Sequence, residues 1–361
     1  MVSPLRPHCL AVDRLHLWQP PVSARSASGL LSLDAARRIL HALRLGYADS
    51  TAQTYGSGLL VFHVFCDAHH FSEEERSPVH LNVLESFISC LLGFYSASAV
   101  SNIVAGVHAW HVIHGLRWCL DPAEQQVFIR AADRLAPPGR SKRAPLLVDH
   151  LLALAPVFDL SVSLDAAFWA ALLAIFWCTA RCGEFLVPRL DGFDAQVHVQ
   201  RQHMRRERQA GQDVLIFALP WTKTTRFLGA EVFCGAHDGL ADPFKAFDAH
   251  FSVNSPQDSE SLFAHSVNGK RRVLTPAGFR ARLKLAAAAA GISLPLGHSA
   301  RIGSLLWYLL NGMPFAEAMA KGRWQSTSSF HLYLRKHTQV LAPHLEQQPN
   351  LYSELHTRVV E

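Results

Sequence analysis

The stretch from 298 to 333, HSARIGSLLWYLLNGMPFAEAMAKGRWQSTSSFHLY, decides how the rest of the chain is interpreted. His298 and Arg301 stand three residues apart at the start of a helix that the sequence predicts over 299–310. Both side chains therefore lie on one side of a helix N-terminus, where an anion binds readily. The structural alternative is a polar cluster that only caps the helix.

Two aromatic residues follow this helix. Trp324 comes 23 residues after Arg301, and Tyr333 comes nine residues after Trp324. The chain has six tyrosines, and a single tyrosine is usually an ordinary core or surface residue. Tyr333 therefore gains meaning only from the residues that precede it.

Two further cationic residues lie upstream. Arg181 follows the apolar run 166–178, which predicts a buried helix, and Glu184 comes three residues later. Lys223 lies between two predicted strands, on a hairpin loop. Each cation also has an ordinary interpretation. Arg181 could satisfy carbonyls at a helix end or pair with Glu184, and Lys223 could be an exposed turn lysine.

Cleavage of a DNA phosphodiester requires a nucleophile, cations that stabilise the charge of the pentavalent transition state, and a donor that protonates the departing sugar oxygen. Tyr333 is the candidate nucleophile, and the arginines are the candidate cations. Lys223 is the candidate proton donor. The order of these residues along the chain is more informative than any one of them.

This order resembles the tyrosine recombinase (lambda integrase-like) family, whose catalytic domain runs Arg-x-x-Glu, a hairpin Lys, His-x-x-Arg, His or Trp, and Tyr. The residues that fill these places in order are Arg181 with Glu184, Lys223, His298 with Arg301, Trp324 and Tyr333. The resemblance covers about 300 residues, from 36 to 340. The piece Gly322-Arg323-Trp324 is more similar to recombinases of fungal Crypton-type mobile elements.

The resemblance assigns roles to these residues. Arg181 and Arg301 would bind the non-bridging phosphate oxygens, and Glu184 would orient Arg181 as an accessory residue. Trp324 would donate its indole N–H to the phosphate, and His298 would assist proton transfer or steady the phosphate. Tyr333 would form a 3′-phosphotyrosyl bond. The implied enzyme is a site-specific DNA recombinase or integrase.

Composition is compatible with this class. The chain has 361 residues, of which 49% are hydrophobic and 17% are charged, so we expect a globular chain of two domains. The sequence pattern predicts a mobile N-terminal arm over 1–35, a helical domain over 36–135 with a helix over 83–94 and another capped by Ser98, and a linker over 136–145. The resemblance implies that 36–135 is the core-binding domain, that 146–340 is the catalytic domain and that 341–361 is a C-terminal tail.

In the second domain, the spacing of apolar residues changes from helical to strand-like after the first helices. Val197 and Val199 alternate with polar residues, and the runs 214–219 and 231–234 are short and apolar, so we expect a small antiparallel sheet. Helices resume at Thr275-Pro276, a cap followed by proline at the first helical position. The predicted fold class is mainly α with a small antiparallel sheet.

The predicted partner is double-stranded DNA, and the net charge of +5 permits a polyanion. The resemblance implies a homo-tetramer on two DNA sites, with the tail after Tyr333 docked on a neighbouring protomer. Candidate phosphate contacts, each of which could equally be a solvated loop residue, are Lys142, Arg143, Arg201, Arg205, Arg206, Arg208, Lys270, Arg271 and Arg272.

No cofactor or metal is predicted, because the seven cysteines and 21 histidines are scattered without a ligand constellation. No membrane helix or secretory signal is expected, which places the chain inside the cell, and in the nucleus if the host is eukaryotic. Three alternatives remain open at this point. They are a catalytically silent DNA-binding protein derived from a mobile element, a type IB topoisomerase, and a structural helical scaffold.

Overall fold

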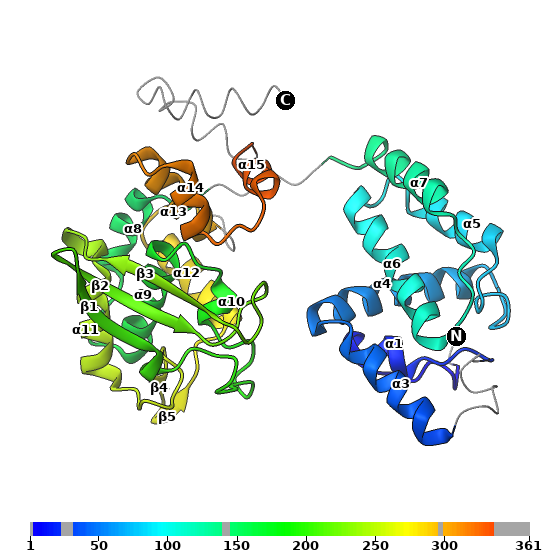
Figure 1. The fold of residues 1–361 in the computed structure, drawn as a ribbon, viewed down its shortest axis with the longest axis horizontal. Coiled ribbons are helices and arrows are strands. Elements are labelled where there is room, and N and C mark those ends of the chain that lie inside the picture. The colour runs from blue at the N-terminus through cyan, green and yellow to red at the C-terminus, as the bar shows by residue number, and fades with distance from the viewer. Residues whose placement is uncertain (1–2, 23–31, 139–144, 295–298, 336–361) are drawn as a thin grey trace. The chain divides into compact units, whose positions relative to one another are not determined.

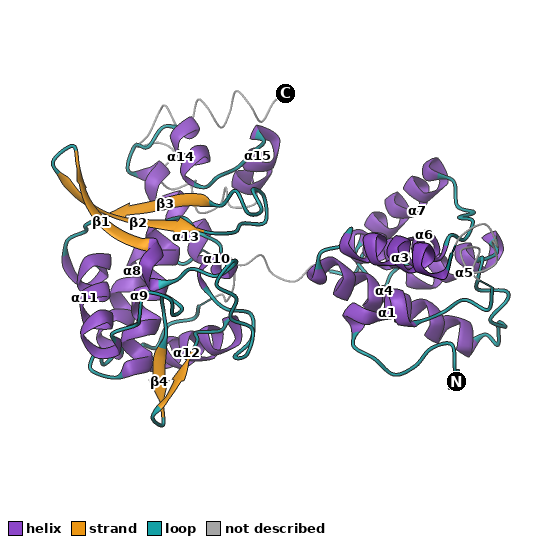
Figure 2. Cartoon of the chain, turned by 60° about the horizontal axis from the view of Figure 1, so that its bottom comes forward, coloured by secondary structure: helices purple, strands orange, loops and turns teal. Residues whose placement is uncertain are grey.

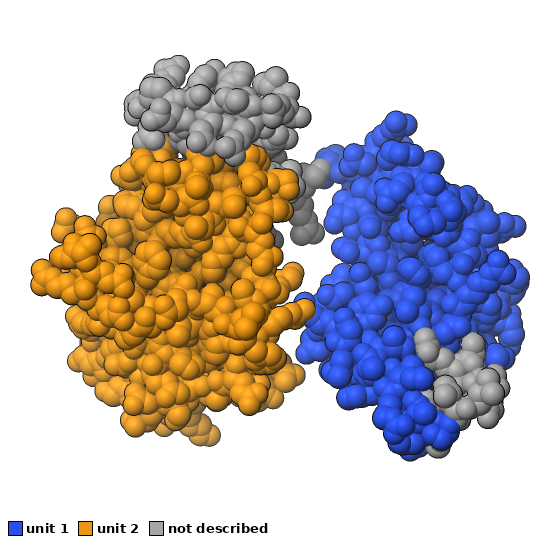
Figure 3. Space-filling model, viewed as in Figure 1, with its two compact units in different colours: residues 1–141 blue, residues 142–361 orange. Residues whose placement is uncertain are grey.

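The structure is a computed structural model that describes residues 3–22, 32–138, 145–294 and 299–335. It divides into two compact units, Met1–Ser141 and Lys142–Glu361, which are coloured separately in Figure 3. The boundary between the units falls inside the stretch 136–145 that the sequence marks as a linker. The predicted fold class, mainly α with a small antiparallel sheet, is confirmed.

The first unit is helical (Figure 1). Its described elements are η1 (Ala11–Asp13), α1 (Arg14–Leu17), α3 (Leu33–Leu45), α4 (Asp49–Ala68), α5 (Leu81–Leu91), α6 (Ala97–His114) and α7 (Pro122–Arg134). Two glycines let α4 and α6 approach closely. A Cβ at Gly58 would lie 2.7 Å from the Cα of Ile103, and one at Gly106 would lie 2.3 Å from the carbonyl oxygen of Tyr55. The backbones of the two helices are therefore in direct contact.

Two helix boundaries in this unit differ from prediction by a few residues. The helix predicted over 83–94 is α5, which ends at Leu91 and leaves Phe94 exposed. The helix predicted to follow Ser98 begins earlier, because the hydroxyl of Ser96 accepts the N–H of Ala99 and caps α6. Two serines two residues apart offer equivalent caps, and local sequence alone does not separate them.

The N-terminal segment is the main correction in this unit. A mobile arm was expected over 1–35, but residues 3–22 pack on the helices. Leu15 is fully buried, and the backbone carbonyl of Trp18 accepts the indole N–H of Trp110 at 2.7 Å. Arg6 forms an ion pair with Asp67 at 3.0 Å and another with Glu73 at 2.9 Å. Burial and ion pairs therefore hold residues 3–22 in place, although their sequence shows no hydrophobic periodicity.

Asp67→Asn is expected to loosen this segment. The Asp67 carboxylate also pairs with Arg76 at 2.9 Å, so the substitution leaves two largely buried guanidinium groups to share the one carboxylate of Glu73. Such a loss costs about 3 kcal/mol. Hydrogen exchange at the amide of Gln19, which bonds the carbonyl of Leu5 at 2.9 Å, should speed up accordingly.

The same carboxylate predicts a pH dependence. Burial acts to raise the pKa of Asp67, but the hydrogen bonds from Arg6 and Arg76 outweigh it and hold the pKa below its usual value. Its contribution to stability is therefore complete above about pH 4 and is lost as the pH falls through the lower, folded-state pKa. Asp67→Asn should abolish this acid dependence at Gln19, whereas Arg38→Gln at an exposed pair should not. Equal exchange in wild type and Asp67→Asn would contradict the anchoring role.

The second unit carries the sheet. Its described elements are α8 (Val148–Leu154), η2 (Ala155–Val157), α9 (Ser163–Trp177), α10 (Cys182–Phe185), η3 (Arg201–His203), β1 (Met204–Gln209), β2 (Gln212–Leu219), β3 (Ala230–Gly235), η4 (Gly239–Ala241), α11 (Pro243–Asn254), β4 (His265–Val267), β5 (Lys270–Arg272), α12 (Pro276–Ala289), α13 (Ser299–Leu310), α14 (Phe315–Lys321) and α15 (Thr327–Arg335).

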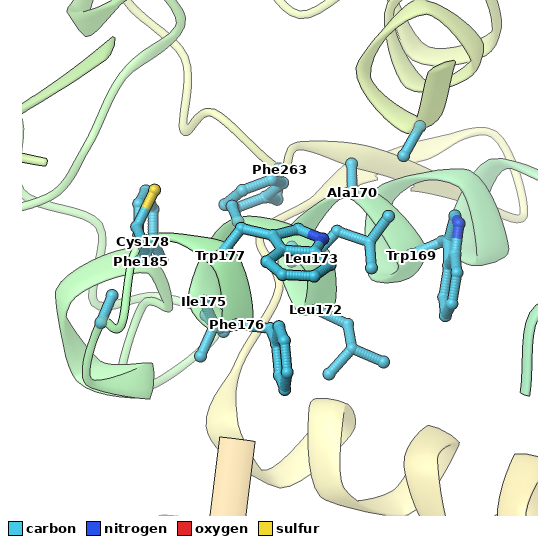
Figure 4. Close-up of a cluster of buried hydrophobic side chains, with 14 of the residues drawn as sticks. Trp169, Ala170, Leu172, Leu173, Ile175, Phe176, Trp177, Cys178, Phe185 and Phe263 are labelled. Atoms are coloured by element: carbon cyan, nitrogen blue, oxygen red, sulfur yellow. The ribbon is translucent and has the colours of Figure 1, made fainter. Parts of the chain in front are cut away.

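Helix α9 is the centre of this unit. Every residue from Ala166 to Cys178 is buried, as the unbroken apolar run predicts for a helix that is covered on all sides. Figure 4 shows side chains such as Trp169, Phe176 and Trp177 projecting from α9 in different directions into the core. The residues that follow α9 are consequently held on a rigid support.

The sheet is antiparallel in the order β1-β2-β3, with a separate hairpin of β4 and β5 (Figure 2). β2 and β3 match the two predicted apolar runs. The third strand is not at Val197 and Val199, as expected, but at β1, where Met204 pairs with Phe217. β1 has the sequence MRRERQ and pairs on one edge only, so one buried residue suffices and the apolar pattern is missing.

Two helix starts agree with prediction. The hydroxyl of Thr275 accepts the N–H of Gly278 and caps α12, whose first residue is Pro276. α13 has the predicted bounds Ser299–Leu310. Among the described residues, no helix combines the length and the apolar character that crossing a bilayer demands.

Candidate active site

Two helices of the second unit end in the same kind of turn. α9 is followed by Thr179 at a φ of 50°, and α14 is followed closely by Arg323 at a φ of 56°. The N–H groups of Ala180 and Trp324 donate to carbonyls five residues earlier, at 2.9 and 3.0 Å. This is the Schellman motif, whose left-handed residue is usually glycine. A threonine or an arginine there is strained, and such strain concentrates at functional sites.

Arg301 connects the two turns. Its side chain is 3% exposed and lies at the start of α13. Nη1 donates to the carbonyl of Thr179 at 2.9 Å, and Nη2 donates to the carbonyl of Gly322. The hydroxyl of Thr179 also bonds that of Ser304, on α13, at 2.8 Å. The ends of α9 and α14 are thus tied to the start of α13.

Trp324 covers this arginine. The guanidinium carbon of Arg301 lies 4.3 Å from the centre of the indole ring, a cation–π arrangement. Gly322 makes room for the ring, since a Cβ there would lie 1.6 Å from it. The structure therefore brings together Arg301 and Trp324, two residues that the sequence assigns to one site.

Glu184 joins Arg181 to a residue that the sequence analysis missed. Its carboxylate is 4% exposed and accepts the backbone N–H of Arg181 at 2.8 Å and its Nη1 at 3.0 Å. Oε2, which accepts the backbone N–H of Arg181, also accepts Nη2 of Arg323 at 2.5 Å. Arg181 itself is 26% exposed. The one sequence signal for Arg323 is its place beside Trp324, which does not reveal the ion pair.

Lys223 lies on the connection between β2 and β3, where the sequence places it. A tight turn carries it, because Thr222 and Arg226 exchange backbone hydrogen bonds of 3.2 and 2.9 Å. Lys223 is exposed, as are Phe227 and Leu228. Within the described residues Lys223 has no carboxylate partner.

α15 carries Tyr333. Its residues Phe330 and Leu334 are 1% exposed and pack in a small core with α13 and α14. The partners in that core are Ile302, Leu305, Leu306, Leu309 and Ala318. For Tyr333 the structure describes the backbone alone, so its distance from the arginines stays a prediction. His298 lies outside the described residues.

The predicted phosphate contacts fall into two groups. Arg205 pairs with Glu207 and Glu231, Arg206 with Asp248, and Arg271 with Glu260, while Arg201 stacks on Phe251. Pairing with carboxylates lowers the availability of Arg205, Arg206 and Arg271 for DNA. Arg208, Lys270 and Arg272 are exposed cations of β1 and β5 without a carboxylate partner among the described residues. Lys142 and Arg143 lie outside them.

Lys321 anchors the turn that holds Arg323. Its Nζ donates to the carbonyl of Phe233 at 3.1 Å and lies 4.5 Å from the rings of Phe233 and Tyr308. Burial lowers the pKa of Lys321. Beneath it, hydrogen bonding to Cys178 and burial raise the pKa of the Cys234 thiol. These groups fix α14 against β3.

The electrostatics of the site favour an anion. Three guanidinium groups, those of Arg181, Arg301 and Arg323, lie at or beside the two turns, and the carboxylate of Glu184 bonds those of Arg181 and Arg323. A phosphate diester suits such an excess of positive charge. No three His, Cys, Asp or Glu side chains of residues 3–22, 32–138, 145–294 and 299–335 are grouped to hold a metal ion.

Comparison with known proteins places the fold. Neither the family models nor the curated proteins give a match. Among solved structures, the XerH site-specific recombinase bound to its difH substrate in a pre-cleavage complex has a TM-score of 0.53 and 13% identity, over 92% of this chain and 95% of that one. The fold is therefore that of the tyrosine recombinases, as the motif order predicts.

Two further solved structures are similar at lower scores. The XerA recombinase has a TM-score of 0.36 and 15% identity, over 85% of this chain and 96% of that one. A Flpe–Holliday junction complex has a TM-score of 0.36 and 10% identity, over 81% of this chain and 76% of that one.

Proposed function

We propose that this chain is a site-specific DNA recombinase that cleaves and rejoins DNA through Tyr333. The observation that carries the proposal lies at two strained helix ends. There, Arg301 bonds the carbonyl of Thr179, two residues before Arg181, and lies against the ring of Trp324. α15, which carries Tyr333, packs on the same helix that bears Arg301. The recombinase fold supports this assignment.

The proposed reaction is an exchange of one phosphodiester for another. The phenol oxygen of Tyr333 forms a bond to phosphorus as the bond to the 5′ oxygen of the next nucleotide breaks. The phenol proton leaves, with His298 assisting, and Lys223 protonates the 5′ oxygen. The resulting 3′-phosphotyrosyl bond keeps the energy of the broken ester, so rejoining requires no ATP.

The arginines would stabilise the charge that grows on the non-bridging oxygens in the transition state. Such electrostatic stabilisation is usually the largest contribution to rate enhancement. Arg181 is 26% exposed and held by Glu184, so it is pre-oriented for this contact. The indole ring of Trp324 would shield the phosphate from water on one side. Glu184 is a positioning residue in this scheme.

DNA contact is proposed for both units. Arg208, Lys270 and Arg272 are the stronger candidates for phosphate contacts, because Arg205, Arg206 and Arg271 already pair with carboxylates. Assembly of four protomers on two DNA sites, through the tail 341–361, and a nuclear location in a eukaryotic host belong to the same proposal.

Tyr333→Phe is expected to abolish covalent adduct formation. The test uses duplexes with a nick placed near each possible cleavage point, so that the short released strand diffuses away and traps the intermediate. Intact protein should yield an adduct stable in denaturant, with the tryptic peptide of Tyr333 attached to DNA. Phenylalanine keeps the ring and removes the attacking oxygen, so the variant should give none while binding DNA equally well.

Two results would contradict the proposal. An adduct that survives Tyr333→Phe would place the nucleophile elsewhere, and intact protein that forms none across a broad duplex library would favour a catalytically silent DNA-binding protein. Relaxation of supercoiled plasmids without any specific site would indicate a type IB topoisomerase instead.

A further inference from the structure

Two polar groups of Arg323 have no partner in the part of the chain that the structure describes. Nη2 bonds Glu184, but Nε and Nη1 are buried and have no hydrogen-bond acceptor among the described residues. Buried N–H groups are nearly always satisfied in native proteins, and a charged guanidinium is the costliest group to leave unpaired. The described residues therefore offer no acceptor to these two groups.

The backbone at Arg323 is held in a conformation that its side chain disfavours. It occupies the left-handed position of the turn after α14, where glycine is the usual residue. Hydrogen bonds on both sides fix the turn, since the N–H groups of Arg323 and Trp324 reach the carbonyls of Ala320 and Met319 at 2.9 and 3.0 Å. The chain thus keeps both a strained backbone and unpaired donors at one residue.

The surroundings identify the missing acceptor as an anion. Arg323 shares the carboxylate of Glu184 with Arg181, and the residue before it, Gly322, supplies the carbonyl that holds Arg301. A group that enters this place must satisfy N–H donors and carry negative charge. A phosphate does both, because its non-bridging oxygens accept charge-assisted hydrogen bonds.

We propose that Arg323 is a further phosphate-binding residue, which turns from Glu184 and donates to a non-bridging oxygen of the DNA phosphate held by Arg181 and Arg301. This rests on the proposed function in that the phosphate is the scissile one. Glu184 then keeps its bonds to Arg181. The unpaired donors of the free protein gain an acceptor when DNA is bound.

The first test asks whether the effect of Arg323 on adduct formation depends on the negative charge of the scissile phosphate. Arg323→Gln keeps a donor for Glu184 but removes the positive charge, and should slow adduct formation on the trapped duplex by about 100-fold. A methylphosphonate at the scissile position has one non-bridging oxygen replaced by a neutral methyl group. On that substrate the deficit of Arg323→Gln should largely vanish, which a merely structural role would not produce. An equal deficit on both substrates, or none on either, overturns the proposal.

Arg323→Gly separates function from folding. Glycine suits the left-handed turn, and its introduction removes the unpaired donors, so the thermal midpoint should stay or rise while adduct formation falls. A fall in the midpoint together with wild-type adduct formation would show that Arg323 only supports the turn. Arg189→Gln, at a side chain that is 75% exposed, is the matched control and should change neither property.

The second test does not depend on catalysis. The salt dependence of binding to a mixed-sequence duplex reports the number of phosphate contacts, and loss of one contact lowers the slope by about 0.9. Arg323→Gln should show that decrease and Arg189→Gln should not. If intact protein forms no adduct, the proposed function fails, but the salt dependence of binding still tests whether Arg323 contacts a phosphate. A slope that is the same in Arg323→Gln and in intact protein overturns the proposed contact.

Discussion

Arg301→Ala is expected to lower the rate of adduct formation by about 1,000-fold, the size of effect seen when a transition-state arginine is removed. The same change should reduce the free energy of unfolding of the second unit by about 3 kcal/mol, because the carbonyls of Thr179 and Gly322 lose their buried donor. Both effects come from one side chain. Arg301 supplies positive charge to the phosphate, and it also connects the ends of two helices by hydrogen bonds.

Arg301→Lys distinguishes the two roles. Lysine retains the charge, but a single ammonium group cannot reach both carbonyls and lie flat under the indole ring of Trp324. We expect most of the stability loss to remain and part of the activity to return.

Arg282→Ala is the matched control for folding. Arg282 pairs with Asp165 through two hydrogen bonds of 2.6 and 2.7 Å, and these residues lie on α12 and α9. Its removal should cost about 3 kcal/mol as well, with adduct formation by folded protein close to wild type. Adduct formation is measured on the nicked duplex below the unfolding transition of every variant. An equal loss in Arg282→Ala would mean that instability, not charge, explains Arg301→Ala.

The spacing of hydrophobic residues predicted the elements that are buried evenly along their length. The apolar run 166–178 is a core helix because it is covered on all sides, and no tertiary detail is needed to recognise it. α12 and α13 begin where local capping signals place them. In such segments local preference and tertiary packing agree.

The errors have a common cause, which is stabilisation by distant residues. β1 is an arginine-rich edge strand whose pairing with β2 supplies its hydrogen bonds, so hydrophobic alternation was absent. Residues 3–22 show no hydrophobic periodicity, and contacts such as that between Arg6 and Asp67, 61 residues apart, hold them in place. A short stretch of sequence does not reveal the strand pairing or the long-range contact.

The candidate site shows the same division. The order of Arg181, Lys223, Arg301 and Trp324 predicted one site, and the structure joins Arg301 to Trp324 and Arg181 to Glu184. Arg323 escaped notice because its importance lies in a left-handed backbone and in unpaired donors, which are properties of the folded chain. A glycine in that place would have looked like an ordinary helix end.

Gly303→Ala is the second large effect that we expect, and it tests how α13 is positioned. A Cβ at Gly303 would lie 1.6 Å from the carbonyl oxygen of Leu146 and 2.6 Å from its carbonyl carbon. Backbone atoms cannot swing aside as a side chain end can, so α13 must move away from Leu146. The hydrogen bond from the N–H of Leu146 to the carbonyl of Ser299, 3.0 Å long, should be lost with that movement. We expect a loss of about 3 kcal/mol in the free energy of unfolding.

Activity should fall with it even in folded protein, because Arg301 lies two residues before Gly303 on the same helix. A shift of about 1 Å in a reacting group can cost about 100-fold in rate. The measurements are thermal unfolding and adduct formation on the nicked duplex. Gly235→Ala is the control, since the nearest atom to a Cβ there is 4.0 Å away and the residue lies on β3. Wild-type stability and adduct formation in Gly303→Ala would show that contact with Leu146 does not set the position of Arg301, and the site would then depend on the turns at Thr179 and Arg323 alone.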